Sequence, residues 1–170
     1  MPRSTKNNNI IVNVNFEKFK FDNGDPEGCF EQLSYFLFCR KYKLSDGISG
    51  YRNQTGIEKD PITLGNKVIG FQAKFFETTI NYDKLKEGLK KAKKKHPKLN
   101  HVIFYINKLR NESSSQITTI SSPEQGLNDL AKELKIQIEW FDPGKFIIAL
   151  NEPINLDLGQ LYFGAADNLS

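Results

Sequence analysis

The sequence predicts an α/β protein in which a mixed central sheet is flanked by helices. Apolar residues recur at helical spacing in several segments, and short apolar runs typical of strands lie between them. Gly65-Asn66 separates two such runs, as in a β-hairpin, and the helical and strand patterns that follow alternate. Because the chain has 170 residues, we expect one domain over 10–160, with a disordered segment at 1–9 and a tail or linker at 161–170.

The first third of the chain predicts one firm helix. Residues 10–21 alternate only weakly, which favours a short edge strand or an arm. Asp25-Pro26-Glu27 has the residues preferred at a helix start, because Asp caps free amides, Pro suits the first turn and Glu favours the positive end of the dipole. The apolar periodicity continues to about Lys43 and places Glu31 beside the buried face. Residues 45–56 are rich in Gly, Asn and Ser, which predicts a loop.

The rest of the chain predicts a hairpin followed by alternating helices and strands. The hairpin strands are expected at 57–64 and 67–76, on either side of the glycine-asparagine turn. Beyond them we expect a helix at 83–95, a buried strand at 101–106, a loop at 107–121, a helix at 122–135, a strand at 136–141 and a short helix at 143–150.

Composition excludes several classes of protein. The aromatic content of 12% argues against disorder, and no apolar run approaches the roughly 18 residues that span a bilayer. The amino terminus lacks the apolar stretch of a signal peptide, so we expect a cytoplasmic protein. Cys29 and Cys39 fall about 15 Å apart on one predicted helix, too far for a disulfide. His96 and His101 lack the spacing of a zinc site.

The net charge of +4 is concentrated in one segment. Residues 83–98 hold eight lysines and two acids, a local charge of +6, and the remainder of the chain carries −2. Such a patch guides a polyanion to one face of a protein, and Lys90, Lys91 and Lys94 are the expected phosphate contacts. The alternative is an amphipathic helix whose lysines only solvate its outer face.

Polar residues interrupt both strands of the predicted hairpin. Glu58 and Asp60 are two positions apart and share one face of an extended strand, and Gln72 and Lys74 do the same. A three-residue loop would place Asp60 opposite Gln72 and Glu58 opposite Lys74. A two-residue loop shifts the register by one and puts the two pairs on opposite faces.

In the three-residue register these groups suit a metal-dependent hydrolase. Carboxylate and amide oxygens are ligands that Mg²⁺ prefers, and a lysine at the rim helps to deprotonate a metal-bound water or stabilises charge on a phosphate. The alternative is a salt-bridged polar face on a half-exposed strand, and spacing alone does not decide between them.

Asp60 followed twelve residues later by Gln72-Ala73-Lys74, after a helix bearing Glu31, resembles the PD-(D/E)xK restriction-endonuclease-like superfamily. The likeness is greatest to the branch with Gln in the third motif, as in Mrr-like nucleases. The run from Tyr51 to Glu58 leading into 69–76 is also similar to the amino-terminal nuclease domains of Avs-type STAND NTPases in bacterial antiphage defence. The resemblance covers roughly 26–150 and implies a core of α-β-β-β-α-β type.

Carried over to this chain, the resemblance makes Gln72 a ligand of Mg²⁺ or Mn²⁺ and Lys74 the catalytic lysine. The strand acid is Glu58 or Asp60: Gly56-Ile57-Glu58 matches a family run with Glu in place of Asp, whereas Asp60-Pro61 reverses the family's order. Glu31 matches an acid of the family's first helix that binds metal or water.

Arg52 and Asn53, in the loop before the active strand, are expected to line the nucleic-acid cleft. A loop role without ligand contact is the alternative.

These implications define the expected function. We expect a Mg²⁺-dependent endonuclease whose substrate is DNA, with double-stranded DNA as the first choice. We expect it to serve as the effector of an antiphage defence protein. A regulatory or sensor domain or chain, and a homo-oligomer, are the expected partners. The alternatives are a degenerate nuclease-fold module that binds nucleic acid or a partner protein without cutting, and an RNA nuclease.

Overall fold

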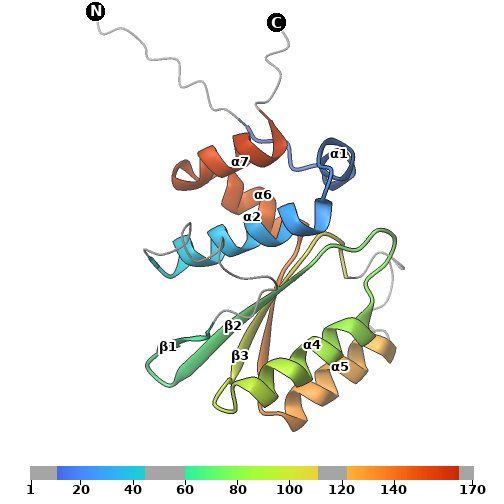
Figure 1. Ribbon diagram of the computed structural model, residues 1–170, viewed down its shortest axis with the longest axis vertical. Helices are drawn as coiled ribbons and strands as arrows, with labels where there is room; N and C mark the ends of the chain where they lie inside the picture. Colours follow the sequence, from blue (N-terminus) through green and yellow to red (C-terminus); the bar gives the residue numbers. More distant parts are fainter. Residues whose placement is uncertain (1–10, 45–59, 111–121, 165–170) are drawn as a thin grey trace, which may run out of the picture.

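A computed structural model describes residues 11–44, 60–110 and 122–164 (Figure 1). These residues form a four-stranded sheet, six α-helices and one short 3₁₀-helix, so the expected α/β class is confirmed. The elements are α1 Phe16–Asp22, α2 Pro26–Lys41, β1 Ile62–Leu64, β2 Lys67–Lys74, α4 Tyr82–Lys95, β3 His101–Ile106, α5 Ser122–Glu133, β4 Gln137–Phe141, α6 Pro143–Leu150, η1 Pro153–Asn155 and α7 Leu156–Phe163.

The sheet is mixed, and its strands follow one another in the order β1-β2-β3-β4. β1 and β2 form the expected antiparallel hairpin, whereas β2, β3 and β4 are parallel and are connected through α4 and α5. Parallel neighbours need such crossover helices because the chain has to return to the same end of the sheet before each new strand.

The hairpin register differs from the three-residue loop considered above. Leu64 pairs with Lys67 and Ile62 with Ile69, so Gly65 and Asn66 alone form the turn. Gly65 has a φ of 58°, a conformation favoured by glycine at the first central position of a two-residue hairpin turn. The pairing of Asp60 with Gln72, which a three-residue loop predicts, is therefore wrong, because the turn has two residues.

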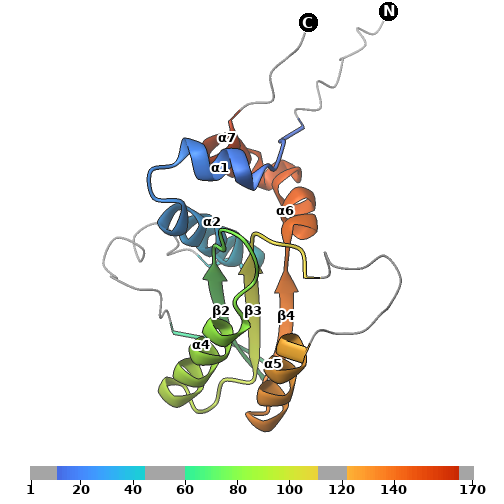
Figure 2. The same cartoon turned by 90° about the vertical axis from the view of Figure 1, so that its right-hand side faces the viewer.

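Helices cover both faces of the sheet (Figures 1 and 2). The face that carries Ile69 and Tyr105 packs against α2 and α6, in a core that also contains aromatic residues of α1. The face that carries Val102 and Phe104 packs against α4 and α5, through Leu85, Leu89 and Leu127 among others. Because successive side chains of a strand alternate between faces, neighbouring residues of β2 enter different cores.

The helix starts show how far the local sequence determines structure. The expected helix after Asp25 is confirmed, and the Asp25 side chain accepts a hydrogen bond from the Gly28 amide at 3.0 Å. An edge strand or arm was expected at 10–21, and this prediction is wrong from residue 16 onward, where the chain forms α1. There Asn15 caps the amides of Glu17 and Lys18, and the rings of Phe16 and Phe19 join the aromatic core. Helix α7 was not predicted.

Two asparagine side chains attach the ends of β3 to β2. Before the strand, Asn100 Oδ1 accepts a hydrogen bond from the Val68 amide, and its Nδ2 donates to the Asn66 carbonyl, both at 2.8 Å. After the strand, Asn107 Oδ1 accepts from the Phe76 amide at 2.7 Å and its Nδ2 donates to the Phe76 carbonyl at 2.8 Å. The side-chain amides thus continue the ladder beyond the last backbone pairs.

Candidate metal and nucleic-acid site

Gln72 lies in the middle of β2 and its side chain packs beneath α4. A methyl group built on Gly88 of α4 would come within 2.5 Å of Gln72 Oε1, so the absence of a side chain at position 88 makes room for the carboxamide. Gln72 Oε1 is buried and has no hydrogen-bond partner among the described residues. A buried acceptor without a partner is uncommon in proteins, and this one is covered by α4.

Lys74 ends β2 and lies near Glu31 of α2. Glu31 is half-buried, and this burial raises the pKa of its carboxyl above the usual value. The positive charge of Lys74 partly offsets that rise, and the nearby carboxylates of Glu27 and Asp25 add to it. The charge of Lys74 on β2 thus acts on Glu31 of α2, and the assignment of both residues to one catalytic site stays a prediction.

Asp60 lies two residues before β1 and is exposed. The described ladder between β1 and β2 ends at Ile62 and Ile69, so Asp60 is not paired with Gln72. Glu58, Arg52 and Asn53 lie outside the described residues. The described part of the chain therefore brings together only part of the predicted site.

The carboxylate and amide oxygens of these residues are of the type that Mg²⁺ prefers, but within the described residues they do not lie around one common point. Gln72 Oε1 faces α4, whereas Glu31 belongs to α2 on the opposite face of the sheet. In the described ranges no group of three or more His, Cys, Asp or Glu side chains is placed to hold a metal ion.

The predicted phosphate-binding lysines lie on the last two turns of α4, and Lys90, Lys91 and Lys94 are all exposed. Lys93 Nζ donates a hydrogen bond to the Leu99 carbonyl at 2.7 Å, which ties this end of the helix to the start of β3. Helix α4 runs back along β2, so these lysines lie toward the end of the strand that begins at Lys67. Lys74 is at the other end of that strand (Figure 2). Seven residues of strand at about 3.3 Å each separate the two ends by about 23 Å.

A second polar cluster, not predicted from the sequence, lies on the α2 face of the sheet. Glu139 of β4 bonds to His101 Nε2 at 3.1 Å and to Lys41 Nζ at 3.0 Å, and Lys145 Nζ lies at 3.9 Å. Partial burial raises the pKa of Glu139, but the hydrogen bonds from His101 and Lys41 outweigh it and lower the pKa below its usual value. An acid within the otherwise largely apolar run of β4 was the one sequence signal for this cluster.

Comparison with known proteins does not assign the chain to a family. No model of a known protein family matches the chain, and no curated protein shows a significant sequence match. The fold defines an α/β protein with an open mixed sheet. No helix among the described ranges has both the length and the apolar character needed to cross a bilayer.

Proposed function

We propose that the protein is a metal-dependent DNA endonuclease of the PD-(D/E)xK type. The observation that supports it most is the electrostatic interaction between Glu31 and Lys74, which are 43 positions apart in the sequence. The resemblance of the sequence to Mrr-like nucleases assigns these positions to the acid of the first helix and to the lysine of the QxK motif. This type of site needs a lysine whose charge acts near the acid that holds metal or water.

In the proposed reaction, the oxygen of water forms a P–O bond to a phosphodiester while the P–O bond to the leaving oxygen breaks. The water loses a proton and the leaving oxygen takes one up from solvent. Mg²⁺, held by Gln72 together with Glu58 or Asp60, would polarise the scissile phosphate and lower the pKa of the attacking water. Lys74 stabilises negative charge that develops on the phosphate oxygens. Glu31 acts through Lys74, whose charge it faces from α2, and its raised pKa brings it closer to the pH at which a carboxylate acts as a general base.

The exposed lysines of α4 supply the substrate affinity in this proposal. Each phosphate that Lys90, Lys91 or Lys94 neutralises releases counterions, which favours binding at low salt. These lysines lie toward one end of β2 and Lys74 is at the other, and the strand's length of about 23 Å corresponds to about seven base pairs of B-DNA. A duplex is therefore a better substrate than a mononucleotide or dinucleotide, because only a longer molecule reaches both.

Incubation of the protein with supercoiled plasmid, linear duplex and single-stranded RNA, each with Mg²⁺ or EDTA, tests the proposal. We expect cleavage of DNA in Mg²⁺ only, with loss of at least about a hundredfold in rate for Lys74→Ala. Lys132→Ala, which removes an exposed lysine from the last turn of α5, is the matched control and retains the activity. Cleavage retained by Lys74→Ala would disprove this site, and cleavage of RNA alone would identify an RNA nuclease.

One observation favours the alternative of a binding module with a degenerate site. Gln72 replaces an acid with a neutral amide, and its oxygen is buried beneath α4. Both features reduce the attraction of this position for a cation. Binding of duplex DNA in a mobility-shift assay, with no cleavage in Mg²⁺ or Mn²⁺ at any protein concentration, supports that alternative, provided that a regulatory chain from the proposed defence system does not restore cutting.

A further inference from the structure

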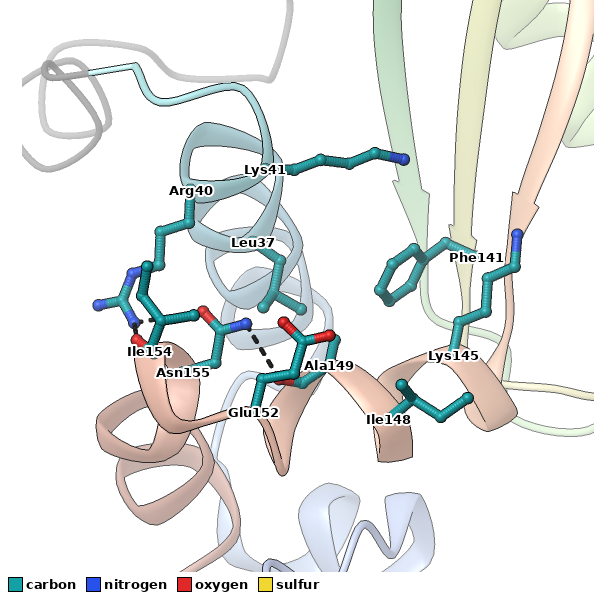
Figure 3. A pocket seen from close by; sticks show the side chains of 10 residues that line it. All are labelled: Leu37, Arg40, Lys41, Phe141, Lys145, Ile148, Ala149, Glu152, Ile154 and Asn155. Atoms are coloured by element: carbon teal, nitrogen blue, oxygen red, sulfur yellow. Dashed lines mark hydrogen bonds between the residues drawn. The ribbon is translucent and has the colours of Figure 1, made fainter.

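A pocket with a volume of about 320 Å³ lies between the end of α2, α6 and η1, beside the end of β4 (Figure 3). Its volume is at the lower end of the range found for small-molecule sites, about 300 to 1,000 Å³. Apolar side chains form much of its wall. They are Leu37, Phe141, Ile148, Ala149 and Ile154.

Two lysines give one end of this pocket a positive charge. Lys41 comes from the last turn of α2 and Lys145 from the first turn of α6, and Figure 3 shows both extending toward the strands, on the same side as Phe141. Both ammonium groups pair with the carboxylate of Glu139. Lys41 Nζ lies 3.0 Å and Lys145 Nζ lies 3.9 Å from Glu139 Oε1. Because one carboxylate faces two ammonium groups, a net positive charge is left here, and each ammonium keeps hydrogen-bond donors that Glu139 does not use.

The opposite wall of the pocket is held in place by ion pairing. Arg40 binds both carboxylate oxygens of Asp157 at 2.6 Å and donates to the Ile154 carbonyl at 2.7 Å. Asn155 Nδ2 donates to the Ala149 carbonyl at 2.9 Å (Figure 3). The charges of Arg40 and Asp157 cancel, and the wall is formed before a ligand arrives, which lowers the entropic cost of binding.

The apolar wall of the pocket is supported by the core behind it. The ring of Phe141, which lines the pocket, packs 4.6 Å from the ring of the fully buried Tyr105. Lys41, Lys145 and Glu152 line the same pocket as the apolar side chains. Polar and apolar groups therefore meet here in the arrangement typical of sites that bind amphipathic small molecules.

We infer that this pocket binds a small organic monoanion with an apolar body, of the class of medium-chain carboxylates. The anionic group accepts hydrogen bonds from the donors of Lys41 and Lys145 that Glu139 does not use, and the chain packs on Leu37, Phe141 and Ala149. One negative charge matches the net charge at that end, whereas Glu152, which also lines the pocket, disfavours ligands of higher negative charge. The inference goes beyond nuclease activity, since Lys41 lies ten residues, about 15 Å, along α2 from Glu31.

Octanoate is the probe, with octylamine and 1-octanol as controls of the same chain length. Two-dimensional amide NMR spectra of the full chain are recorded during each titration. We expect octanoate to shift the amide signals of Leu37, Lys145 and Ala149 in a saturable manner, with weaker shifts from octanol and none from octylamine. Absence of saturable shifts at millimolar octanoate, or equal shifts by octylamine, would overturn the inference.

Charge variants separate specific binding from general attraction. Lys41→Gln and Lys145→Gln should each weaken octanoate binding about threefold to tenfold, and Glu152→Gln should strengthen it by up to about threefold. Lys132→Gln, on α5 at the other face of the sheet, should leave the Kd unchanged. An equal loss of affinity in Lys132→Gln would show that only net charge matters and would contradict the site.

A variant at the mouth of the pocket keeps the test independent of the Glu139 cluster. Ile148 is exposed, so Ile148→Glu should fold normally, which a thermal melt verifies. Its added negative charge should weaken octanoate binding at least about fivefold, whereas Ile148→Gln should weaken it less. Unchanged affinity in Ile148→Glu would place octanoate elsewhere. None of these measurements depends on nuclease activity, so failure here leaves the proposed function unaffected.

Discussion

Gly88 of α4 lies directly against the carboxamide of Gln72 on β2. A methyl group at position 88 would approach Gln72 Oε1 to 2.5 Å and both Cδ and Nε2 to 3.0 Å. The absence of a side chain at position 88 therefore sets how closely α4 approaches the sheet. It also determines where the only amide of the QxK motif points.

Replacement of Gly88 by alanine should destabilise the protein by about 1 kcal/mol. Alanine favours a helix over glycine by up to about 1 kcal/mol, but its methyl group has to displace a packed side chain, and overpacking costs about 1 to 3 kcal/mol. Urea unfolding measures the change. In a Gln72→Ala background the obstacle is gone, so Gly88→Ala should become stabilising there.

Gly126 of α5 offers the matched control for Gly88. A methyl group at position 126 would meet the end of the Lys86 side chain, at 2.6 Å from Nζ. Lys86 is long and partly exposed, so its ammonium moves away at little cost. Gly126→Ala should therefore stabilise the protein by about 0.5 to 1 kcal/mol. Equal effects at both glycines would contradict the proposed role of the Gln72 carboxamide.

Asn107 should be the more important of the two asparagines that attach β3 to β2. Its carboxamide is buried and pairs with both the amide and the carbonyl of Phe76, so Asn107→Ala leaves two buried backbone groups without partners. Each such group costs about 1 to 3 kcal/mol, and a total loss of about 2 to 6 kcal/mol is expected. Urea unfolding of Asn107→Ala and of Asn107→Asp, which keeps one acceptor, measures it.

Asn100→Ala is the comparison for Asn107→Ala. Its hydrogen bond to the Asn66 carbonyl is exposed, so water replaces part of what the substitution removes. A loss of about 1 kcal/mol is expected. If both alanine variants lost the same stability, burial would not be the reason for the difference between them.

The helix starts and the mixed sheet were predictable because they depend on local chemistry. Asp25 before a proline, and a glycine-asparagine pair between apolar runs, act within a few residues of themselves. The hairpin register was not predictable in the same way. Because helices cover both faces of the sheet, β2 carries apolar residues on both faces, such as Val68 and Ile69. The pattern of apolar residues along β2 therefore does not determine which face packs against α2.

The candidate site was only partly predictable for a related reason. The charge of Lys74 acts on Glu31 because α2 packs on β2. The resemblance of the sequence to a nuclease family assigns both residues to the site, and that assignment stays a prediction. The cluster around Glu139 joins β4, α2 and α6, and no short-range pattern relates these elements. Residues of that kind become visible only when tertiary packing is known.

Glu31 should make the stability of the protein depend on pH in an unusual direction. Because burial raises its pKa above the usual value near 4.5, the folded state binds more protons than the unfolded state between the two pKa values. Stability therefore falls as pH rises through that interval. Glu31→Gln should flatten this fall and be more stable than the wild type at pH 7, by less than about 1 kcal/mol, since solvent screens a half-exposed group.

Urea unfolding at pH values from 4 to 7 tests the effect of Glu31, with Glu133→Gln on α5 as the control. Glu133 is exposed and lies on the other face of the sheet, so its replacement should preserve the slope. Lys74→Gln removes the charge that lowers the Glu31 pKa and should extend the loss of stability to higher pH. A slope that is the same in wild type and Glu31→Gln would refute this account.

The lysines of α4 should determine how DNA binding responds to salt. Replacing Lys90, Lys91 and Lys94 together with Gln removes three exposed charges from one surface. Each lost phosphate contact lowers the slope of log affinity against log salt concentration by about 0.9, so a decrease of up to about 2.7 is expected. Fluorescence anisotropy in EDTA measures binding without metal-dependent cleavage. The control replaces Lys18, Lys43 and Lys145, which lie on the α2 side of the sheet, with Gln. If the two triple variants lost equal slope, net charge rather than the α4 surface would account for binding.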